Sequence, residues 1–514
     1  MADTEIKRKF GAWADPPVPI PAEQITETIR ADVVVLGAGM SGVSCALRAA
    51  QGGASVAVLE KTGAWAGRGG NIGVVNSSFM KSQGFENDPE EFAREWIKRA
   101  GNRCDERILW RYIKGSPRAM DWLLEIVTRP EYGCRPALQG SYYTGETYLE
   151  HVGSHRLFGG PMEKKGMRVG GADAVYAMFT EAEKLGVRFF FRSPAVELKK
   201  DGDRVTGAVA RTENGYLLAE AAKAVVIATG DIGGNEEMCA DLAPLANQCE
   251  SKIYWPKGGN MGDGHRLGLW AGGSFDELPF PTMLHPQAYH FRNYCFLFVR
   301  PDGHRFMNED NYVQGKTVAI LRERIPYAWS IMDSDWREKV PATLPYGGGL
   351  FWGCDCEEGQ SEFILEDEEM FLEMGLKRGV VVTADTPEAL AEKMGVPADV
   401  FAAEFARYND LCTAGKDEDF GKRRELLIPI DKPPYFGMKF APSLLAVMGG
   451  LHVNADQNVL SEDNVPVPGL YAVGNAAGGR YGVDYPVLIP GNSHGTALTL
   501  GFLLGERLGG IEEA

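Results

Sequence analysis

A short run of glycines after an apolar segment most constrains the fold of this chain. Residues 33–36 are Val-Val-Val-Leu, and Gly-Ala-Gly-Met-Ser-Gly follows at 37–42. Residues 43–50 have the small apolar pattern of a helix, and a second apolar run at 55–59 ends at Glu60. This order of strand, glycine turn, helix, strand and acid is the fingerprint of a dinucleotide-binding unit. The sequence therefore predicts an α/β fold with a Rossmann-like parallel sheet.

Each part of this fingerprint has an expected role. Gly37 permits the tight turn, Gly39 lets the backbone approach a pyrophosphate, and Gly42 lets helix and strand pack closely. Glu60 lies about 20 residues on, where an acid accepts hydrogen bonds from a ribose 2′-hydroxyl. The free N–H groups of the helix N-terminus bind the pyrophosphate charge. They come from the residues that open this helix, Met40 and Ser41.

Size and charge narrow the class of protein. A chain of 514 residues exceeds a single core and predicts two or three domains. The net charge of −17 argues against nucleic acid and against an anionic membrane surface as partners. No apolar run reaches the roughly 18 residues of a membrane span, and residues 1–30 show no apolar signal core. We therefore expect a cytoplasmic protein without a membrane span.

The chain order predicts a nucleotide-binding domain that is split in sequence. Another buried strand that ends in small residues stands at 224–230, and one more strand ends in glycine at 469–475. Helices are predicted at 106–127, 386–412 and 496–508, among others. The residues between about 240 and 370 are rich in aromatics and glycine and lack clean βα alternation, which predicts an inserted α+β cap domain. The predicted segments are an N-terminal arm (1–30), the first part of the nucleotide domain (31–240), the cap (241–370), a helical segment (371–435) and the second part of the nucleotide domain (436–514).

Eight motifs, in this order and across nearly the whole chain, resemble the FAD-dependent fumarate reductase / 3-ketosteroid dehydrogenase superfamily. They are VVVLGAGMSG with Glu60, GGN at 69–71, AVVIATGDIGGN at 224–235, GDG at 262–264, LHP at 284–286, RFMNE at 305–309, MGG at 448–450 and GLYAVGNAAGG at 469–479. The resemblance implies a Rossmann-like FAD-binding domain and a cap that closes over the isoalloxazine ring.

The resemblance implies FAD as the cofactor. In the membrane-bound fumarate reductases a histidine near the GG segment attaches FAD covalently, whereas this chain has Arg68-Gly-Gly-Asn there, so we expect non-covalent FAD. His494 is expected to pack against the cofactor. Besides the turn, the expected cofactor contacts are Glu60, Lys61, Gly69, Gly70, Asn71, Val196, Thr229, Gly230, Gly474, Asn475, Gly491, Asn492 and Ser493.

The family moves a hydride between flavin N5 and one carbon of a conjugated C=C bond, and a proton goes to or from the neighbouring carbon. In members that reduce carboxylates, His285 matches a substrate-binding histidine and Arg292 matches an arginine of the proton relay. Three other family groups are absent. The proton-donating arginine is Val313 here, a histidine is Ala446, and residues 480–494 replace a carboxylate-binding arginine. Burying uncompensated carboxylates costs several kcal/mol, so fumarate itself is disfavoured.

The replacements resemble the ketosteroid dehydrogenase pattern. Tyr485-Pro486 precedes Gly491, as in enzymes where a tyrosine hydroxyl and a backbone N–H grip the substrate ketone. A tyrosine in the RFxNE segment acts there as base or acid, and Tyr312 is the nearest candidate. A phenol with an unperturbed pKa of about 10 suits the protonation of an enolate. The predicted catalytic residues are therefore Tyr312, Tyr485, Arg292 and His285.

The predicted function is reduction or dehydrogenation of a bulky apolar enone, such as a 3-oxo-steroid or bile-acid intermediate. Only one dinucleotide fingerprint is present, so electrons must come from or go to an external partner such as a reduced flavin, a small carrier or a partner reductase. Two alternatives stay open. One is a reductase of an unsaturated carboxylate of the urocanate, acrylate or fumarate type, which Arg292, Arg480 and His285 would favour. The other is a flavoprotein subunit that relays electrons. A flavin hydroxylase would need an NAD(P)H site, for which no motif is present.

Overall fold

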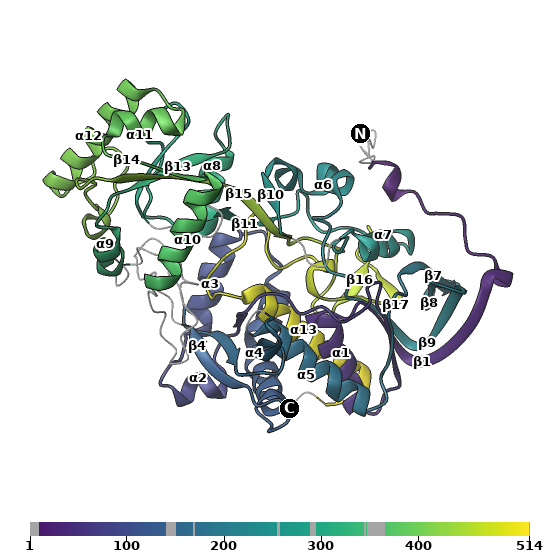
Figure 1. The fold of residues 1–514 in the computed structure, drawn as a ribbon. Helices are drawn as coiled ribbons and strands as arrows, with labels where there is room; N and C mark the ends of the chain where they lie inside the picture. The colour runs from purple at the N-terminus through teal and green to yellow at the C-terminus, as the bar shows by residue number, and fades with distance from the viewer. Residues whose placement is uncertain are drawn as a thin grey trace.

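The computed structural model describes residues 10–139, 151–167, 170–253, 258–287, 295–343, 346 and 365–512. All structural statements below concern these residues. Figure 1 shows two sheets, of which the larger carries α1, α4, α5 and α13 and the other lies with α9, α10, α11 and α12 at the far end of the molecule.

The larger sheet is mainly parallel, in the order β16-β17-β9-β1-β2-β6. The central strand β1 pairs in parallel with β2 on one side, where Val33 lies opposite Val56. On the other side it pairs in parallel with β9, where Val34 lies opposite Val225. β17 and β6 continue the parallel pairing, while β16 and the hairpin β7–β8 run antiparallel. The strands are β1 (Ile25–Leu36), β2 (Val56–Leu59), β6 (Arg188–Phe190), β7 (Ala195–Asp201), β8 (Arg204–Thr212), β9 (Gly215–Ile227), β16 (Asn458–Leu460) and β17 (Pro466–Ala472).

The alternation of side chains along β1 divides the core into two layers. Val33 and Val35 face the layer formed with helices, whereas Val34 and Leu36 face the layer that contains β8 and Leu267. Both layers are closed to solvent, which explains the continuous apolar runs of the parallel strands. The helices of the first layer are α1 (Met40–Gln51), α4 (Glu106–Val127), α5 (Gly171–Lys184) and α13 (Asn492–Gly509).

A small antiparallel sheet lies beside these helices, in the order β3-β5-β4. It joins the segment just after the GGN motif to residues 154–158, since Ile72 pairs with His155. Two helices, α2 (Ser78–Ser82) and α3 (Pro89–Arg99), follow β3 in sequence. The strands are β3 (Ile72–Gly73), β4 (Arg135–Gln139) and β5 (Ser154–Phe158).

The second sheet has the order β10-β15-β13-β12, and β11 and β14 also pair with its long strand β15. β15 begins at Tyr435, beside the predicted boundary between the helical segment and the second part of the nucleotide domain. It pairs with strands of the second sheet and not with those of the nucleotide sheet. The strands are β10 (Ser251–Lys252), β11 (Thr282–Gln287), β12 (Leu297–Val299), β13 (Ala328–Met332), β14 (Val381–Ala384) and β15 (Tyr435–Val447). The helices between residues 236 and 414 are α6 (Glu236–Leu242), α7 (Asp263–Trp270), α8 (Val313–Leu321), α9 (Trp336–Thr343), α10 (Leu365–Arg378), α11 (Pro387–Met394) and α12 (Ala398–Ala414).

Three element boundaries differ from the sequence prediction. β1 begins at Ile25 rather than Ala31, because the mostly exposed residues of its first half pair with β9 and carry no apolar signal. The predicted helix at 386–412 is two helices, since Gly395 adopts φ +71° and Pro397 precedes α12. α13 begins at Asn492 rather than Thr496, directly after Gly491 with φ +80°. The residues at its start are weak helix formers that gave no periodic signal.

Candidate functional site

The carboxyl ends of four parallel strands meet at one edge of the larger sheet. Gly37 follows β1 and its N–H donates to the carbonyl of Leu59, the last residue of β2, at 2.8 Å. At the end of β9, Ala228 donates to Leu36 at 2.8 Å, and Val473 after β17 donates to Ile227 at 2.9 Å. Ligands of open α/β sheets bind outside such carboxyl ends. The predicted cofactor residues that follow these strands, Gly37, Glu60, Thr229, Gly230, Gly474 and Asn475, are therefore brought to one edge.

The three glycines of the turn differ in the space around them. Gly37 adopts φ +108°, and a Cβ there would lie 2.5 Å from the carbonyl oxygen of Ala228. A Cβ on Gly42 would lie 2.1 Å from the carbonyl oxygen of Gly37. At Gly39 the nearest atom, the carbonyl oxygen of Ala66, is 3.9 Å away. Open space is thus present only at Gly39, beside the first turn of α1 where Met40 and Ser41 lie, which fits a phosphate on a helix N-terminus.

Glu60 is held by the backbone around it. Its Oε2 accepts a hydrogen bond from the N–H of Ala38 at 2.8 Å, and its Oε1 accepts from the N–H and the hydroxyl of Thr62 at 2.8 Å each. Val196 lies in β7, whose preceding segment returns to this place because Ser193 donates to the carbonyl of Glu60 at 2.8 Å. The carboxylate is fixed with lone pairs to spare, as an acceptor for ribose hydroxyls requires.

Lys61 forms an ion pair with Asp263 of the GDG motif, with Nζ 2.7 Å from Oδ2. Asp263 also holds Arg266 at 2.7 Å, one turn further along α7. These contacts fasten α7 to the end of β2.

The N-terminus of α13 lies against the GGN segment. Gly73 donates to the carbonyl of Gly491 at 2.9 Å, and Nδ1 of His494 lies 3.0 Å from the carbonyl oxygen of Asn71. The His494 ring occupies the space beside Gly69, where a Cβ would lie 2.3 Å from Cε1. Burial lowers the pKa of His494 to about 4, so the ring is neutral. The sequence places no histidine near the GG segment, but the fold brings one there from 423 residues away.

Two observations at this helix fit a further ligand. The Oδ1 atom of Asn492 is buried and has no hydrogen-bond partner, and buried polar atoms are usually paired. The first turn of an 18-residue helix also carries unsatisfied N–H groups and partial positive charge. The edge at Gly39 and the N-terminus of α13, with Gly70 and Ser493 nearby in sequence, are therefore the two parts of the candidate cofactor cradle.

The predicted catalytic residue Tyr485 lies in the loop before α13, and the other predicted catalytic tyrosine, Tyr312, contacts this loop. The Tyr312 hydroxyl donates to Oδ2 of Asp484 at 2.9 Å, and the guanidinium carbon of Arg99 is 5.8 Å from the centre of the Tyr312 ring. The N–H of Tyr485 donates to the other oxygen, Oδ1 of Asp484, at 2.8 Å. Burial raises the pKa of the Asp484 carboxyl to about 6. The Tyr485 hydroxyl accepts from the N–H of Ser493 at 3.2 Å, in the first turn of α13.

These tyrosines differ in exposure. Tyr485 is 4% exposed, and burial raises the pKa of its hydroxyl well above the ordinary value. Tyr312 is half-buried. Of the two hydroxyls, that of Tyr312 is therefore the more accessible to a small molecule.

The three positions that lack family groups come together in space. Val313, Ala446 and Tyr485 are all buried and belong to one hydrophobic cluster, which also includes Met448 and the half-buried Met283. The sequence alone showed three separate substitutions. The fold brings these positions into one buried hydrophobic cluster.

The other predicted polar groups are placed differently. His285 lies in β11 opposite Ser443 and is buried, which lowers its pKa to about 3 and leaves it neutral. Arg480 is 2% exposed and donates to the carbonyls of Gly474 at 2.7 Å and Ala477 at 3.0 Å. Nη2 makes both of these bonds and Nη1 donates to the hydroxyl of Thr496 at 3.2 Å, so both Nη atoms already have partners within the protein. Arg292 lies outside the described residues.

Sequence reasoning missed Asp484 and Gln314. No motif marks either residue, and Asp484 is 172 residues from Tyr312. Gln314 is buried; its Oε1 accepts from the N–H of Leu284 at 2.7 Å, and its Nε2 donates to Thr282 at 2.8 Å. A signal was present only for Asp484, an acid within the segment that departs from the family pattern.

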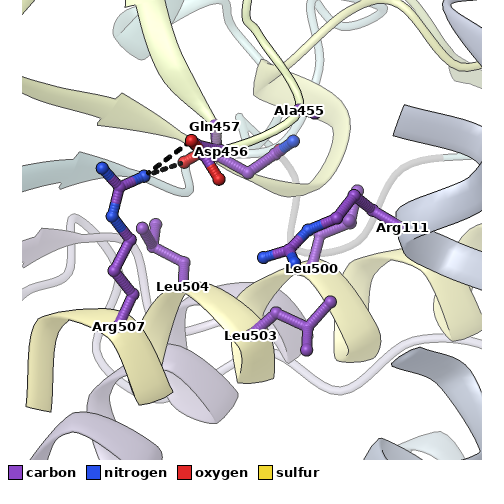
Figure 2. A pocket seen from close by; sticks show the side chains of 8 residues that line it. All are labelled: Arg111, Ala455, Asp456, Gln457, Leu500, Leu503, Leu504 and Arg507. Carbon is purple, nitrogen blue, oxygen red and sulfur yellow. Dashed lines mark hydrogen bonds and ion pairs between the residues drawn. The ribbon is translucent and has the colours of Figure 1, made fainter. Parts of the chain in front are cut away.

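A hollow between α4, α13 and the loop before β16 lies away from this site (Figure 2). It is lined by the second half of α13, including Leu500, Leu503 and Leu504, and by the ion pair of Asp456 with Arg507. These leucines lie two to three turns beyond the Asn492 end of α13, so the hollow does not form part of the predicted site. Within the described ranges, no helix is long and apolar enough to span a membrane, and no group of three or more metal-binding side chains occurs.

Proteins of known function have sequences similar to this chain. The chain is 25% identical over 488 residues to the NADH:fumarate oxidoreductase of Klebsiella pneumoniae, covering 93% of this chain and about half (47%) of that protein. It is 28% identical over 496 residues to the vinyl phenol reductase of Lactiplantibacillus plantarum, covering 91% of this chain and 94% of that protein.

A solved structure shares the fold. The 3-ketosteroid-Δ4-(5α)-dehydrogenase of Rhodococcus jostii in complex with 4-androstene-3,17-dione superposes with a TM-score of 0.74 at 23% identity, over 96% of this chain and 99% of that one. The FAD binding domain family matches residues 32–487. The match spans most of the sequence and includes the glycine turn, both sheets and the Tyr485 segment, so the chain belongs to the FAD binding domain family of flavoprotein oxidoreductases.

Proposed function

We propose that this protein is an FAD-dependent oxidoreductase that reduces, or forms, a C=C bond conjugated to a neutral acceptor group in a bulky apolar molecule. The foremost substrate class is an enone such as a 3-oxo-steroid or bile-acid intermediate. The observation that carries this proposal is the convergence of Val313, Ala446 and Tyr485 in one buried apolar cluster. The buried members of this cluster are apolar or aromatic, and a carboxylate placed against them would give up its hydration at a cost of several kcal/mol.

In this proposal FAD binds non-covalently across the cradle described above. Gly39 and the first turn of α1 would hold the pyrophosphate, Glu60 would accept hydrogen bonds from the ribose, and the N-terminus of α13 would lie near the flavin ring. When bound, FAD supplies the hydride that ends on one carbon of the double bond. His494 fills the space beside Gly69 and, being neutral, packs against the ring system without adding charge.

The protein's own residues then supply the proton. Tyr312 is the proposed donor, because the residue is half-buried and its hydroxyl donates a hydrogen bond to Asp484. Tyr485, whose oxygen lies 3.2 Å from the N–H of Ser493, marks the place where a hydroxyl and a helix N-terminus can polarise a substrate oxygen. The apolar cluster excludes water and so strengthens both interactions.

A second candidate substrate class is a vinyl phenol. The match to the vinyl phenol reductase of Lactiplantibacillus plantarum covers 91% of this chain and 94% of that protein. A vinyl phenol is also a neutral, apolar molecule with a conjugated double bond. A reductase of unsaturated carboxylates is less well supported, because the Nη atoms of Arg480 already donate to two backbone carbonyls and to the hydroxyl of Thr496, and because His285 is neutral. Electrons are proposed to come from an external donor, such as a reduced flavin or a small carrier protein.

Anaerobic reoxidation of the reduced holoprotein tests this function. The yellow protein is photoreduced and mixed with a 3-oxo-Δ4-steroid, 4-vinylphenol, urocanate or fumarate, and the flavin absorbance near 450 nm is followed. We expect rapid reoxidation by one of the two neutral acceptors and at most about one-hundredth of that rate with the carboxylates, equivalent to roughly 2.7 kcal/mol of transition-state binding. Reoxidation by fumarate or urocanate with both neutral acceptors inert would overturn the proposal.

A further inference from the structure

The hydrogen bond between Tyr312 and Asp484 joins two parts of the molecule. Tyr312 directly precedes α8, and Gln314 of that helix holds β11 through two hydrogen bonds. Asp484 lies in the loop before α13, which packs with α1 and α4 in the nucleotide-binding part. The phenol of the proposed donor thus comes from one part of the molecule and its hydrogen-bond acceptor from the other.

We propose that Asp484 positions the Tyr312 hydroxyl and returns its proton after each turnover, so that the proton donor is a two-residue relay completed where the cap elements meet the loop before α13. This inference rests on the proposed function, because it takes Tyr312 as the group that protonates the substrate. Asp484 touches Tyr312 and not the reacting carbon, so it is a positioning residue.

The relay balances in protons and electrons. As one carbon of the double bond receives the hydride, the neighbouring carbon gains the electron pair of the π bond and takes the proton of Tyr312. The O–H bond of Tyr312 breaks and a C–H bond forms. The carboxyl group of Asp484 then gives its proton to the phenolate oxygen, and the resulting carboxylate regains a proton from water. Each turnover therefore consumes one solvent proton and one hydride, whose electrons come from the external donor.

The surroundings of Asp484 allow it to exist in both charge states. The Tyr312 hydroxyl, the Gln314 side chain and the N–H of Tyr485 all favour the carboxylate, and the charge of Arg99 from α3 acts in the same direction. Burial opposes them and is the larger effect, which raises the pKa to about 6. A carboxyl group balanced in this way can both donate and accept a proton near neutral pH.

The test compares Asp484→Asn with wild-type holoprotein. Asparagine keeps a hydrogen-bond acceptor for Tyr312 but cannot carry the relayed proton. For reduction, the wild-type kcat is expected to fall as the pH rises through about 6, because the neutral carboxyl is lost. In Asp484→Asn we expect kcat roughly 10- to 100-fold lower below that pH, with this descending limb absent. Asp173→Asn is the matched control, since Asp173 is also buried with a raised pKa but bonds to Met162 and Glu163.

A second readout does not depend on turnover. The protein is labelled with 3-fluorotyrosine, and the ¹⁹F resonance of residue 312 is assigned with Tyr312→Phe among the 18 tyrosines. In wild type this resonance should shift with a midpoint near pH 6 as Asp484 ionises, and in Asp484→Asn the shift should vanish. A pH limb and a fluorine titration that both survive in Asp484→Asn would overturn the relay. If the wild-type protein reduces no acceptor, the proposed function fails, while the fluorine titration still decides whether the two residues share a proton.

Discussion

At the scale of single residues, the glycine turn separates structural from ligand-facing positions. Gly37 and Gly42 are required by the protein itself, because a Cβ at either would overlap backbone oxygen at 2.5 or 2.1 Å. Gly39 has extended backbone, φ −90° and ψ −172°, which any residue can adopt. The fold therefore does not require glycine at this position, whereas the predicted pyrophosphate would.

We expect Gly39→Val to fold normally and to bind FAD at least about 100-fold more weakly, a loss of about 2.7 kcal/mol, because its side chain fills the space proposed for the pyrophosphate. Titration of the apoprotein with FAD, followed by quenching of flavin fluorescence, measures this. In contrast, Gly42→Ala should lower the thermal midpoint of the apoprotein itself. Equal FAD affinity in wild type and Gly39→Val would place the pyrophosphate elsewhere.

At the scale of elements, local signals predicted the long amphipathic helices and the buried strands. The predicted helix at 106–127 coincides with α4, and the predicted strand at 224–230 overlaps the end of β9, which stops at Ile227. Periodicity and capping are local, so they can be seen in sequence. The pairing of β15 with four other strands in the second sheet is tertiary, and no local pattern distinguishes it from pairing in the nucleotide sheet.

The candidate site was likewise predictable from local signals, but its long-range contacts were not. The cofactor residues that follow strands were predicted from the fingerprint and the resemblance, and the fold brings them to one edge. Their contacts with FAD and the catalytic roles stay predictions. Asp484 lies next to Tyr312, and His494 lies next to Gly69, although each pair is far apart in the sequence. Only the folded chain shows that these residues are neighbours.

One buried carboxylate joins three helices of the nucleotide-binding part. Glu506 of α13 is fully buried, and its Oε1 lies 2.8 Å from Arg48 of α1 and 2.7 Å from Arg118 of α4. Figure 1 shows these helices packed side by side beneath the sheet. Removing one partner of a buried pair leaves charge uncompensated.

Glu506→Gln should lower the free energy of unfolding by roughly 2–3 kcal/mol, somewhat less than for a fully buried pair because both arginines keep some exposure to water. Urea titration followed by circular dichroism measures the change. Asp456→Asn is the control, because Asp456, in the loop before β16, pairs with Arg507 of the same helix (Figure 2). This pair, at 3.4 Å, is about half exposed, so its loss should change stability by less than about 1 kcal/mol. Similar losses for both variants would contradict this account of Glu506.

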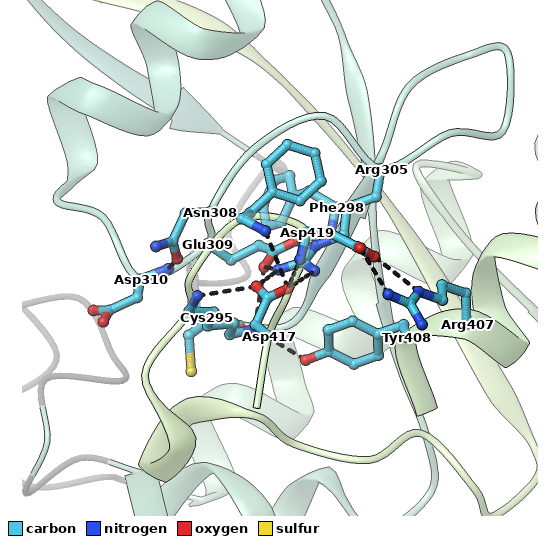
Figure 3. Close-up of polar contacts among 12 residues, drawn as sticks. Cys295, Phe298, Arg305, Asn308, Glu309, Asp310, Arg407, Tyr408, Asp417 and Asp419 are labelled. Carbon is cyan, nitrogen blue, oxygen red and sulfur yellow. Dashed lines mark hydrogen bonds and ion pairs between the residues drawn. The ribbon is translucent and has the colours of Figure 1, made fainter. Parts of the chain in front are cut away.

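At the scale of the whole molecule, the cap elements have their own core and their own charged centre. Figure 3 shows Arg305 of the RFMNE motif between Glu309 and Asp417, with Nη2 2.7 and 2.8 Å from their carboxylates. Lys422 adds an ion pair to Glu309 at 3.2 Å, and all four side chains are buried. The RFMNE motif, which the sequence analysis used for recognition, therefore ties the loop after β12 to the segment after α12.

This centre makes the stability of the cap sensitive to acid. Arg305 holds the pKa of Asp417 at about 2, below its ordinary value of 3.8, and with Lys422 it also lowers the pKa of Glu309. Carboxyl groups with lowered pKa contribute stability above their unfolded pKa values, near 4, and lose it as the pH falls toward about 2.

Glu309→Gln should cost about 3–5 kcal/mol at pH 7 because it leaves Arg305 and Lys422 buried with one carboxylate. Its loss on acidification from pH 5 to 2.5 should also be smaller than that of wild type. Tryptophan fluorescence during urea titration at each pH measures both, and parallel curves for the two proteins across this range would show that the centre contributes nothing to the acid sensitivity.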